Sequence, residues 1–320
     1  MRKLVLAVVT ILWAAVSAQA AEPAPAPAAA SEPPIKTTAP LRVVASFSIL
    51  GDMVENIGGE LVTVKTLVGP GGDAHSYQPT PADLKAIAEA QLVVVNGLGF
   101  EGWMSRLLES AGYKKSVVTA SKGVEPRLIF LNESGDEVQR QITDPHAWQN
   151  LENGQRYAAN IAMALVVAMP DKALALLNRA DKYQSEIGEM DKYIRGEIEA
   201  IPAPQRTIIT SHDAFGYFGE AYGIRFLAPY SANMDTEPSA ANIGSLVTQI
   251  KSEGVKTVFI ENMTNPKLIS QLAADAGAKI GGTLYADALS GKEGTAPSYL
   301  GMFKNNVPLL KAAMLENKKN

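Results

Sequence analysis

The strongest constraint on the fold is a regular alternation of short apolar runs with helical stretches. The clearest run is Leu92 to Val95, where three of the four residues are valine. Uninterrupted β-branched runs are typical of strands buried on both faces of a parallel sheet. Parallel strands need crossover helices, and the preceding sequence supplies one, because Thr80, Pro81 and Asp83 together form a helix start. The alternation therefore predicts an α/β protein.

The alternation occurs in both halves of the chain, on either side of a long helical stretch. Residues 153–200 have an almost entirely helical pattern, interrupted at Met169 and Pro170. We predict two (βα)4-like lobes with parallel sheets, at 41–165 and 204–320, joined by one long rigid helix at 166–203, with the ligand cleft between the lobes. We expect strands at 41–46, 61–68, 92–95, 116–119, 207–210, 256–260 and 280–284, and further helices at 49–57, 80–90, 214–222, 239–253, 266–276 and 298–316.

The N-terminus has the pattern of an export signal. Arg2 and Lys3 precede an apolar run from Leu4 to Val16, and Ala18 to Ala20 form a small-residue cleavage site. We interpret residues 1–20 as a signal peptide, with a membrane anchor as the alternative. Residues 21–40 are rich in alanine and proline, and we expect them to be a disordered tether.

Charge and cysteine content exclude several classes of protein. The 320 residues include 29 basic and 33 acidic side chains, for a net charge of −4, and the absence of basic blocks argues against a nucleic-acid partner. The chain has no cysteine, which excludes disulfides, thiolate metal sites and a cysteine nucleophile. Because no cysteine is available to carry a lipid, we expect a periplasmic protein that is not lipid-anchored.

The three histidines are the most informative residues for function. His75, His146 and His212 each lie in or beside a turn-rich loop, and His75 and His212 follow predicted strands. In parallel α/β sheets, ligands bind beyond the carboxyl ends of the strands. Asp287 offers an oxygen at an equivalent place, after the strand at 280–284. Imidazole nitrogens with a carboxylate suit zinc, and also manganese or iron.

Several segments around these residues carry a resemblance to a known family. They are His75–Asp83, Asn96–Met104, Asp144–Trp148, Ser211–Phe218 and Glu237–Ser239. Together they resemble the zinc- and manganese-type periplasmic solute-binding proteins of ABC importers, the cluster A-I family. The resemblance covers nearly the whole mature chain, from about residue 42 to residue 316.

The resemblance implies a metal site between two lobes, with one ion per chain. The implied ligands are His75 and His146 from the N-terminal lobe and His212 and Asp287 from the C-terminal lobe. Manganese-type members usually have glutamate at the third position, so His212 favours Zn²⁺, with Mn²⁺ as the alternative. The implied function is periplasmic capture of the ion, without catalysis, by a monomer that delivers it to an ABC permease in the inner membrane.

The sequence leaves three other functions to consider. Residues 97–102 match the G-x-G-x-x-G pattern of dinucleotide sites, but they follow the third strand instead of the first, so a tight turn is the better interpretation. A zinc hydrolase would need an open coordination position and a general base, for which Asp144, Asp213 and Glu261 are candidates. Their alternative role is to orient the imidazoles. An adhesin-like surface role is the third.

Overall fold

Two four-stranded parallel sheets form the framework of the computed structural model, which describes residues 39–131, 140–232 and 238–317. All of these residues belong to one compact unit of the chain, and the two sheets confirm the predicted α/β fold class. The first sheet has the order β2-β1-β3-β4, with β2 Val62–Val68, β1 Leu41–Phe47, β3 Leu92–Val95 and β4 Val117–Thr119. The second has the order β10-β9-β7-β8, with β10 Lys279–Leu284, β9 Thr257–Glu261, β7 Thr207–Ile209 and β8 Arg225–Leu227.

The first sheet is built from the local signals that the sequence shows. All four residues of β3 are buried, as their β-branched run predicts. Helix α2 (Pro81–Glu89) begins with a complete capping box, in which the Thr80 hydroxyl accepts from the Asp83 backbone N–H and the Asp83 carboxylate accepts from Thr80. Helices α1 (Ser48–Gly58) and α3 (Met104–Ser110) complete the connections. The loops after β1, β2 and β3 therefore lie at one edge of this sheet.

The second sheet has the helices α6 (Gly216–Tyr222), α7 (Ala240–Glu253), α8 (Pro266–Ala276) and α9 (Tyr299–Glu316). A separate apolar cluster fills the space between β7, β9, α7 and α8, with Ile209, Ile250, Val258 and Leu272 at its centre. Strand β8 was not predicted. It has only three residues, Arg225–Leu227, and is too short to stand out as a strand in the sequence.

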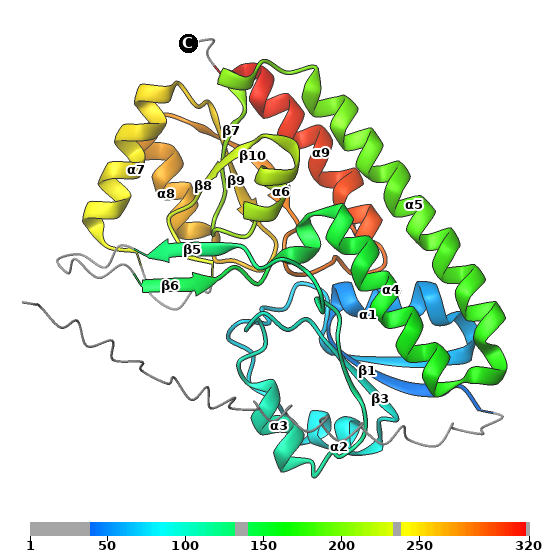
Figure 1. The fold of residues 1–320 in the computed structure, drawn as a ribbon. Helices are drawn as coiled ribbons and strands as arrows, with labels where there is room; N and C mark the ends of the chain where they lie inside the picture. The colour runs from blue at the N-terminus through cyan, green and yellow to red at the C-terminus, as the bar shows by residue number, and fades with distance from the viewer. Residues whose placement is uncertain (1–38, 132–139, 233–237, 318–320) are drawn as a thin grey trace, which may run out of the picture. The chain divides into compact units, whose positions relative to one another are not determined.

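The helices α4 (Leu151–Ala168) and α5 (Ala173–Glu199) lie side by side and are separated by the predicted break at Met169 and Pro170. Helix α5 is about 40 Å long at 1.5 Å per residue, and it contacts α1 as well as α6 and α9 (Figure 1). Within the described ranges no single helix is both long and apolar enough to cross a bilayer, although α4 with residues 170–199 meets that test as a pair bent by 118°.

An antiparallel hairpin, β5 (Leu128–Leu131) with β6 (Arg140–Thr143), lies outside both parallel sheets and was not predicted. Only one residue of β6, Ile142, is apolar, so the segment has no strand pattern of its own. The N–H of Asp144, just after β6, donates to the carbonyl of Arg127, just before β5. The hairpin thus fixes the start of the Asp144–Trp148 segment.

Several predictions lie beyond what this structure tests. The signal peptide at 1–20 and nearly all of the tether at 21–40 fall outside the described residues. The division into lobes at 41–165 and 204–320, with a linking helix at 166–203, also stays a prediction.

A half-buried carboxylate makes the stability of this fold depend on pH. Asp52 of α1 accepts from the backbone N–H of Tyr299 on α9 at 2.9 Å, and the hydroxyl of Tyr183 on α5 lies 3.5 Å away. Burial, together with the nearby charge of Glu55, raises the pKa of Asp52 from 3.8 to about 6. The folded state therefore favours the neutral acid, and the contribution of Asp52 to the free energy of unfolding falls as pH rises from about 4 to above 6.

We predict that Asp52→Asn is more stable than wild type at pH 7.5, by up to about 3 kcal/mol at 1.36 kcal/mol per pKa unit, because asparagine cannot ionise. The gap should close as pH falls towards 4. Denaturant unfolding of both proteins between pH 4 and 8 measures it. Asp275→Asn, at an exposed acid on α8, is the control and should show no such trend. A stability gap for Asp52→Asn that does not change with pH would contradict this assignment.

Candidate metal site

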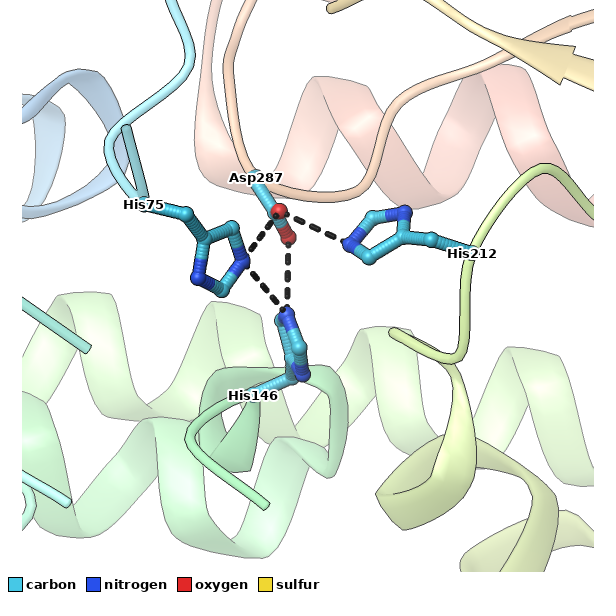
Figure 2. A group of neighbouring side chains, drawn as sticks. All are labelled: His75, His146, His212 and Asp287. Carbon is cyan, nitrogen blue, oxygen red and sulfur yellow. Dashed lines mark hydrogen bonds and ion pairs between the residues drawn. The ribbon is translucent and has the colours of Figure 1, made fainter. Parts of the chain in front are cut away.

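The structure brings the four predicted ligands together (Figure 2). His75 lies in the loop between β2 and α2, and His146 lies between β6 and a short 3₁₀ turn at Ala147–Gln149. His212 follows β7, and Asp287 follows β10. One ligand atom from each of the four lies within 4.8 Å of all the others. The four loops therefore present three imidazole nitrogens and one carboxylate to a single point.

The distances within this group match the spacing of a metal's ligands. Asp287 Oδ2 is 3.2 Å from His75 Nε2 and 3.0 Å from His212 Nε2. His146 Nε2 is 3.3 Å from His75 Nε2 and 3.5 Å from Asp287 Oδ1. In a tetrahedral site with bonds of about 2.0–2.2 Å, neighbouring ligand atoms are about 3.3–3.6 Å apart. Small adjustments of these side chains would thus accommodate one ion at their centre.

Burial makes the charges of the group depend on one another. His146, His212 and Asp287 are completely buried, and the side chain of His75 is 6% exposed. Burial alone would lower the pKa of His146, but the carboxylates of Asp287 and Asp144 raise it to about 9. Burial opposes the charged form of His212 too, yet Glu261 and Asp287 raise its pKa well above the usual value.

The remaining two members shift in the other direction. Burial would raise the pKa of Asp287, but His146 and His212 hold it well below its ordinary range. For His75, burial dominates and lowers the pKa in spite of Asp287. Asp287 is thus a carboxylate anion surrounded by three imidazoles, each of which can bind a proton or a metal ion.

Two of the three imidazoles are oriented by a second carboxylate. Asp144 Oδ1 is hydrogen-bonded to His146 Nδ1 at 2.7 Å. Glu261 Oε2 lies 2.7 Å from His212 Nδ1 as an ion-pair contact, and a small rotation of either side chain would align it as a hydrogen bond. Glu261 Oε1 also accepts the backbone N–H groups of Ser211 and His212. A carboxylate at Nδ1 holds the proton there and leaves Nε2 free to bind a metal. This is the orienting role that the sequence offered as the alternative for Asp144 and Glu261.

Asp213, the third candidate base, does not reach the imidazoles in the same way. Its backbone N–H donates to Tyr230, and its side chain lines a cavity of about 770 Å³ beside α6. Burial and the neighbouring Asp144 raise the pKa of Asp213, while Arg127 opposes that shift.

The glycine-rich segment 97–102 contacts the site through Phe100, whose ring packs against the rings of His75 and His146. Gly97, Leu98 and Gly99 all have positive φ, and a side chain at Gly97 would collide with Thr119. The buried Glu101 carboxylate accepts the backbone N–H groups of Asn96 and Gly97. Since these N–H groups are already occupied, the loop cannot cradle a phosphate through them, which agrees with the tight-turn interpretation.

Two groups of contacts that support the site were not predicted from the sequence. The guanidinium of Arg127 donates to Asp144 Oδ2 at 2.9 Å and to Glu220 at 2.7 Å. Next to Asp287, the Ala286 carbonyl accepts from both Trp148 Nε1 and Gln149 Nε2. Trp148 belongs to a segment that carried the family resemblance, but no local pattern marks Arg127 or Gln149.

Comparison with known proteins gives a consistent relationship over most of the chain. Residues 43–313 match the family described as ZnuA, "Zinc-uptake complex component A periplasmic". The manganese-binding lipoprotein MntA of Halalkalibacterium halodurans is 35% identical over 267 residues, which are 83% of this chain and 86% of that protein. The iron-binding protein YfeA of Yersinia pestis is 32% identical and covers 88% of each chain.

A solved structure shows the same fold. The periplasmic zinc-binding protein TroA of Treponema pallidum superposes with a TM-score of 0.79 at 28% identity, over 86% of this chain and 99% of that one.

These relatives correct one expectation about location. MntA is named a lipoprotein, as are several other relatives of this chain, which contradicts the expectation that the protein is not lipid-anchored. That expectation depended only on the absence of cysteine, and a missing acceptor residue was too narrow a basis for it.

The match over residues 43–313 and the relatives above 30% identity lead to one conclusion. The chain belongs to the ZnuA family of metal-binding solute-binding proteins of ABC importers.

Proposed function

We propose that the protein captures one divalent transition-metal ion between His75, His146, His212 and Asp287 and delivers it to the permease of an ABC importer. The convergence of three Nε2 atoms and a carboxylate within 4.8 Å, completely buried at three of the four residues, is the observation that carries this proposal. The ion is the cargo of the protein.

Binding accounts for this arrangement better than catalysis does. Four protein ligands fill a tetrahedral zinc shell, whereas a catalytic site keeps one position for water or substrate. Asp144 and Glu261 are already engaged with imidazole Nδ1 atoms, so neither is free to act as a general base. We therefore favour a transport protein over a hydrolase.

Zinc is the ion that we favour. Three imidazoles and one carboxylate match the nitrogen-rich set that zinc accepts, whereas manganese prefers oxygen ligands. Manganese is the alternative, because relatives of this chain are named for manganese, iron and zinc. The N-terminal export signal favours capture in the periplasm, with the monomer as the carrier and the inner-membrane permease as its partner.

The first prediction concerns the histidines. Wild type should bind one Zn²⁺ per chain, and alanine at His75, His146 or His212 should weaken binding by more than about a hundredfold, because losing even an orienting partner costs about ten- to a hundredfold. Titration calorimetry measures this, with circular dichroism of each variant in chelator to confirm folding. Unchanged zinc affinity in folded variants would rule out this site.

The second prediction concerns Asp287. Asp287→Ala should weaken binding without abolishing it, since three nitrogens remain and water can take the fourth position. Manganese affinity should fall by a larger factor than zinc affinity, because manganese depends more on oxygen ligands. Asp275→Ala, at an exposed acid, is the matched control. Equal losses for both metals would show that Asp287 does not select between them, and no loss would remove it from the site.

The third prediction tests the orienting carboxylate behind His212. In Glu261→Gln, the amide can still accept the backbone N–H groups, but its NH₂ would face His212 Nδ1. It would then donate to Nδ1 and move the ring proton to Nε2, where it blocks metal binding. We expect a loss of about ten- to a hundredfold in zinc affinity. The control is Glu316→Gln, at an acid paired with Lys279 on the protein surface. Wild-type affinity in Glu261→Gln would show that the tautomer of His212 is set otherwise.

A further inference from the structure

The loop that carries Asp287 is attached to elements of the first sheet, although the chain reaches it from β10 of the second. The backbone N–H of Leu289 donates to the hydroxyl of Ser48, the first residue of α1, at 2.9 Å. The Leu289 carbonyl accepts from the N–H of Gly71, in the loop that holds His75, at 3.0 Å. The loops of Asp287 and His75 are therefore joined directly by a backbone hydrogen bond.

The residues next to His146 hold the other side of the same loop. Trp148 Nε1 and Gln149 Nε2 donate to the Ala286 carbonyl at 2.9 and 3.0 Å, and both side chains are completely buried. The Trp148 ring packs against Phe47 of β1, with ring centroids 5.0 Å apart. Ala286 and Leu289, which flank Asp287 on either side, thus both bond to residues that belong to or pack against elements of the first sheet. On the other side, Asn262 at the end of β9 donates its Nδ2 to the Ala288 carbonyl at 3.2 Å and its backbone N–H to the Leu284 carbonyl at 3.1 Å. Asn306 of α9 also bonds with the backbone N–H and carbonyl of Tyr285, at the start of the loop.

Helix α9, which follows this loop, changes its partners along its length. At its start, the Tyr299 N–H donates to Asp52 of α1 and its hydroxyl donates to the Trp148 carbonyl. At its end, Asn317 bonds reciprocally with Gln205, just before β7. Pro308 lies inside the helix between these two regions, where proline removes a backbone hydrogen bond and favours bending.

His212, in contrast, makes its described hydrogen bonds with the second sheet, apart from its contact with Asp287, although its ring lies against the rings of His75 and His146. Its backbone N–H and its Nδ1 both face Glu261, the last residue of β9. Its carbonyl accepts from the hydroxyl of Thr210, and it forms a β-bridge with Tyr230. No described hydrogen bond other than the contact with Asp287 connects His212 to an element of the first sheet.

We infer that the ligand set is divided three to one: when the two sheets separate to release metal, Asp287 stays with His75 and His146, and His212 leaves. This inference rests on the proposed function. It differs from the division by sequence, which places His212 and Asp287 together in the C-terminal lobe. Release then begins with the loss of one neutral nitrogen ligand, while the carboxylate stays on the ion.

The absence of cysteine allows this to be tested with pairs of spin labels. Three exposed lysines report on the three parts: Lys85 on α2, Lys267 on α8 and Lys292 in the loop after Asp287. The double variants K85C/K267C, K267C/K292C and K85C/K292C are labelled in the full mature chain. Electron–electron distances are then measured with excess Zn²⁺ and with chelator.

Metal should shift the distance distributions of K85C/K267C and K267C/K292C and leave that of K85C/K292C unchanged. A shift in K85C/K292C with a constant K267C/K292C distance would overturn the inference, because Asp287 would then move with the second sheet. No shift in any pair would also overturn it. Zinc titrations of the same labelled proteins separate these outcomes from a failure of the proposed function, in which none of the proteins, including wild type, would bind zinc.

Discussion

The buried carboxylate of Asp287 is the interaction on which the site depends. A fully buried anion is stable only where positive charge or hydrogen-bond donors surround it. Here three imidazoles supply them, and two of these rings are held by further carboxylates. Asp287 is therefore surrounded by imidazoles, and two of these imidazoles have a carboxylate, Asp144 or Glu261, behind them. A divalent cation fits at the centre, between Asp287 and the three rings. The four loops that provide these groups have to be positioned within a few tenths of an ångström.

Parallel sheets provide that precision because the carboxyl ends of their strands lie at one edge. His75 follows β2 at the first sheet, whereas His212 and Asp287 follow β7 and β10 at the second. His146 is placed differently, by the hairpin β5–β6 and the ion pair of Arg127 with Asp144. One histidine thus depends on a hairpin outside both parallel sheets, an element that was not predicted from the sequence.

What could be predicted follows from how local each signal is. The Val-rich run at 92–95, the capping box at Thr80 and the break at Pro170 are set by neighbouring residues, so their elements were predicted closely. Strand β8 is only three residues long, and in the hairpin the apolar run Leu128–Leu131 pairs with the largely polar Arg140–Thr143, so neither fits the alternation of strands and helices on which the prediction depended. Gln149 and Arg127 support the site only through tertiary contacts, so nothing in their own segments marks them. The four ligands could be identified because each lies in a loop near the end of a predicted element, and the family resemblance then implied the same set.

The sequence separation within the site has a consequence for how the protein folds. The contact between His75 and Asp287 joins residues 212 positions apart. Contacts this distant are entropically costly to form early and tend to be completed late in folding. A chain that has folded only its first sheet holds no complete site, whichever ligands it already contains. Bound metal therefore stabilises the finished fold alone, by an amount that grows with the logarithm of metal concentration, and retention of the ion becomes a measure of completed folding.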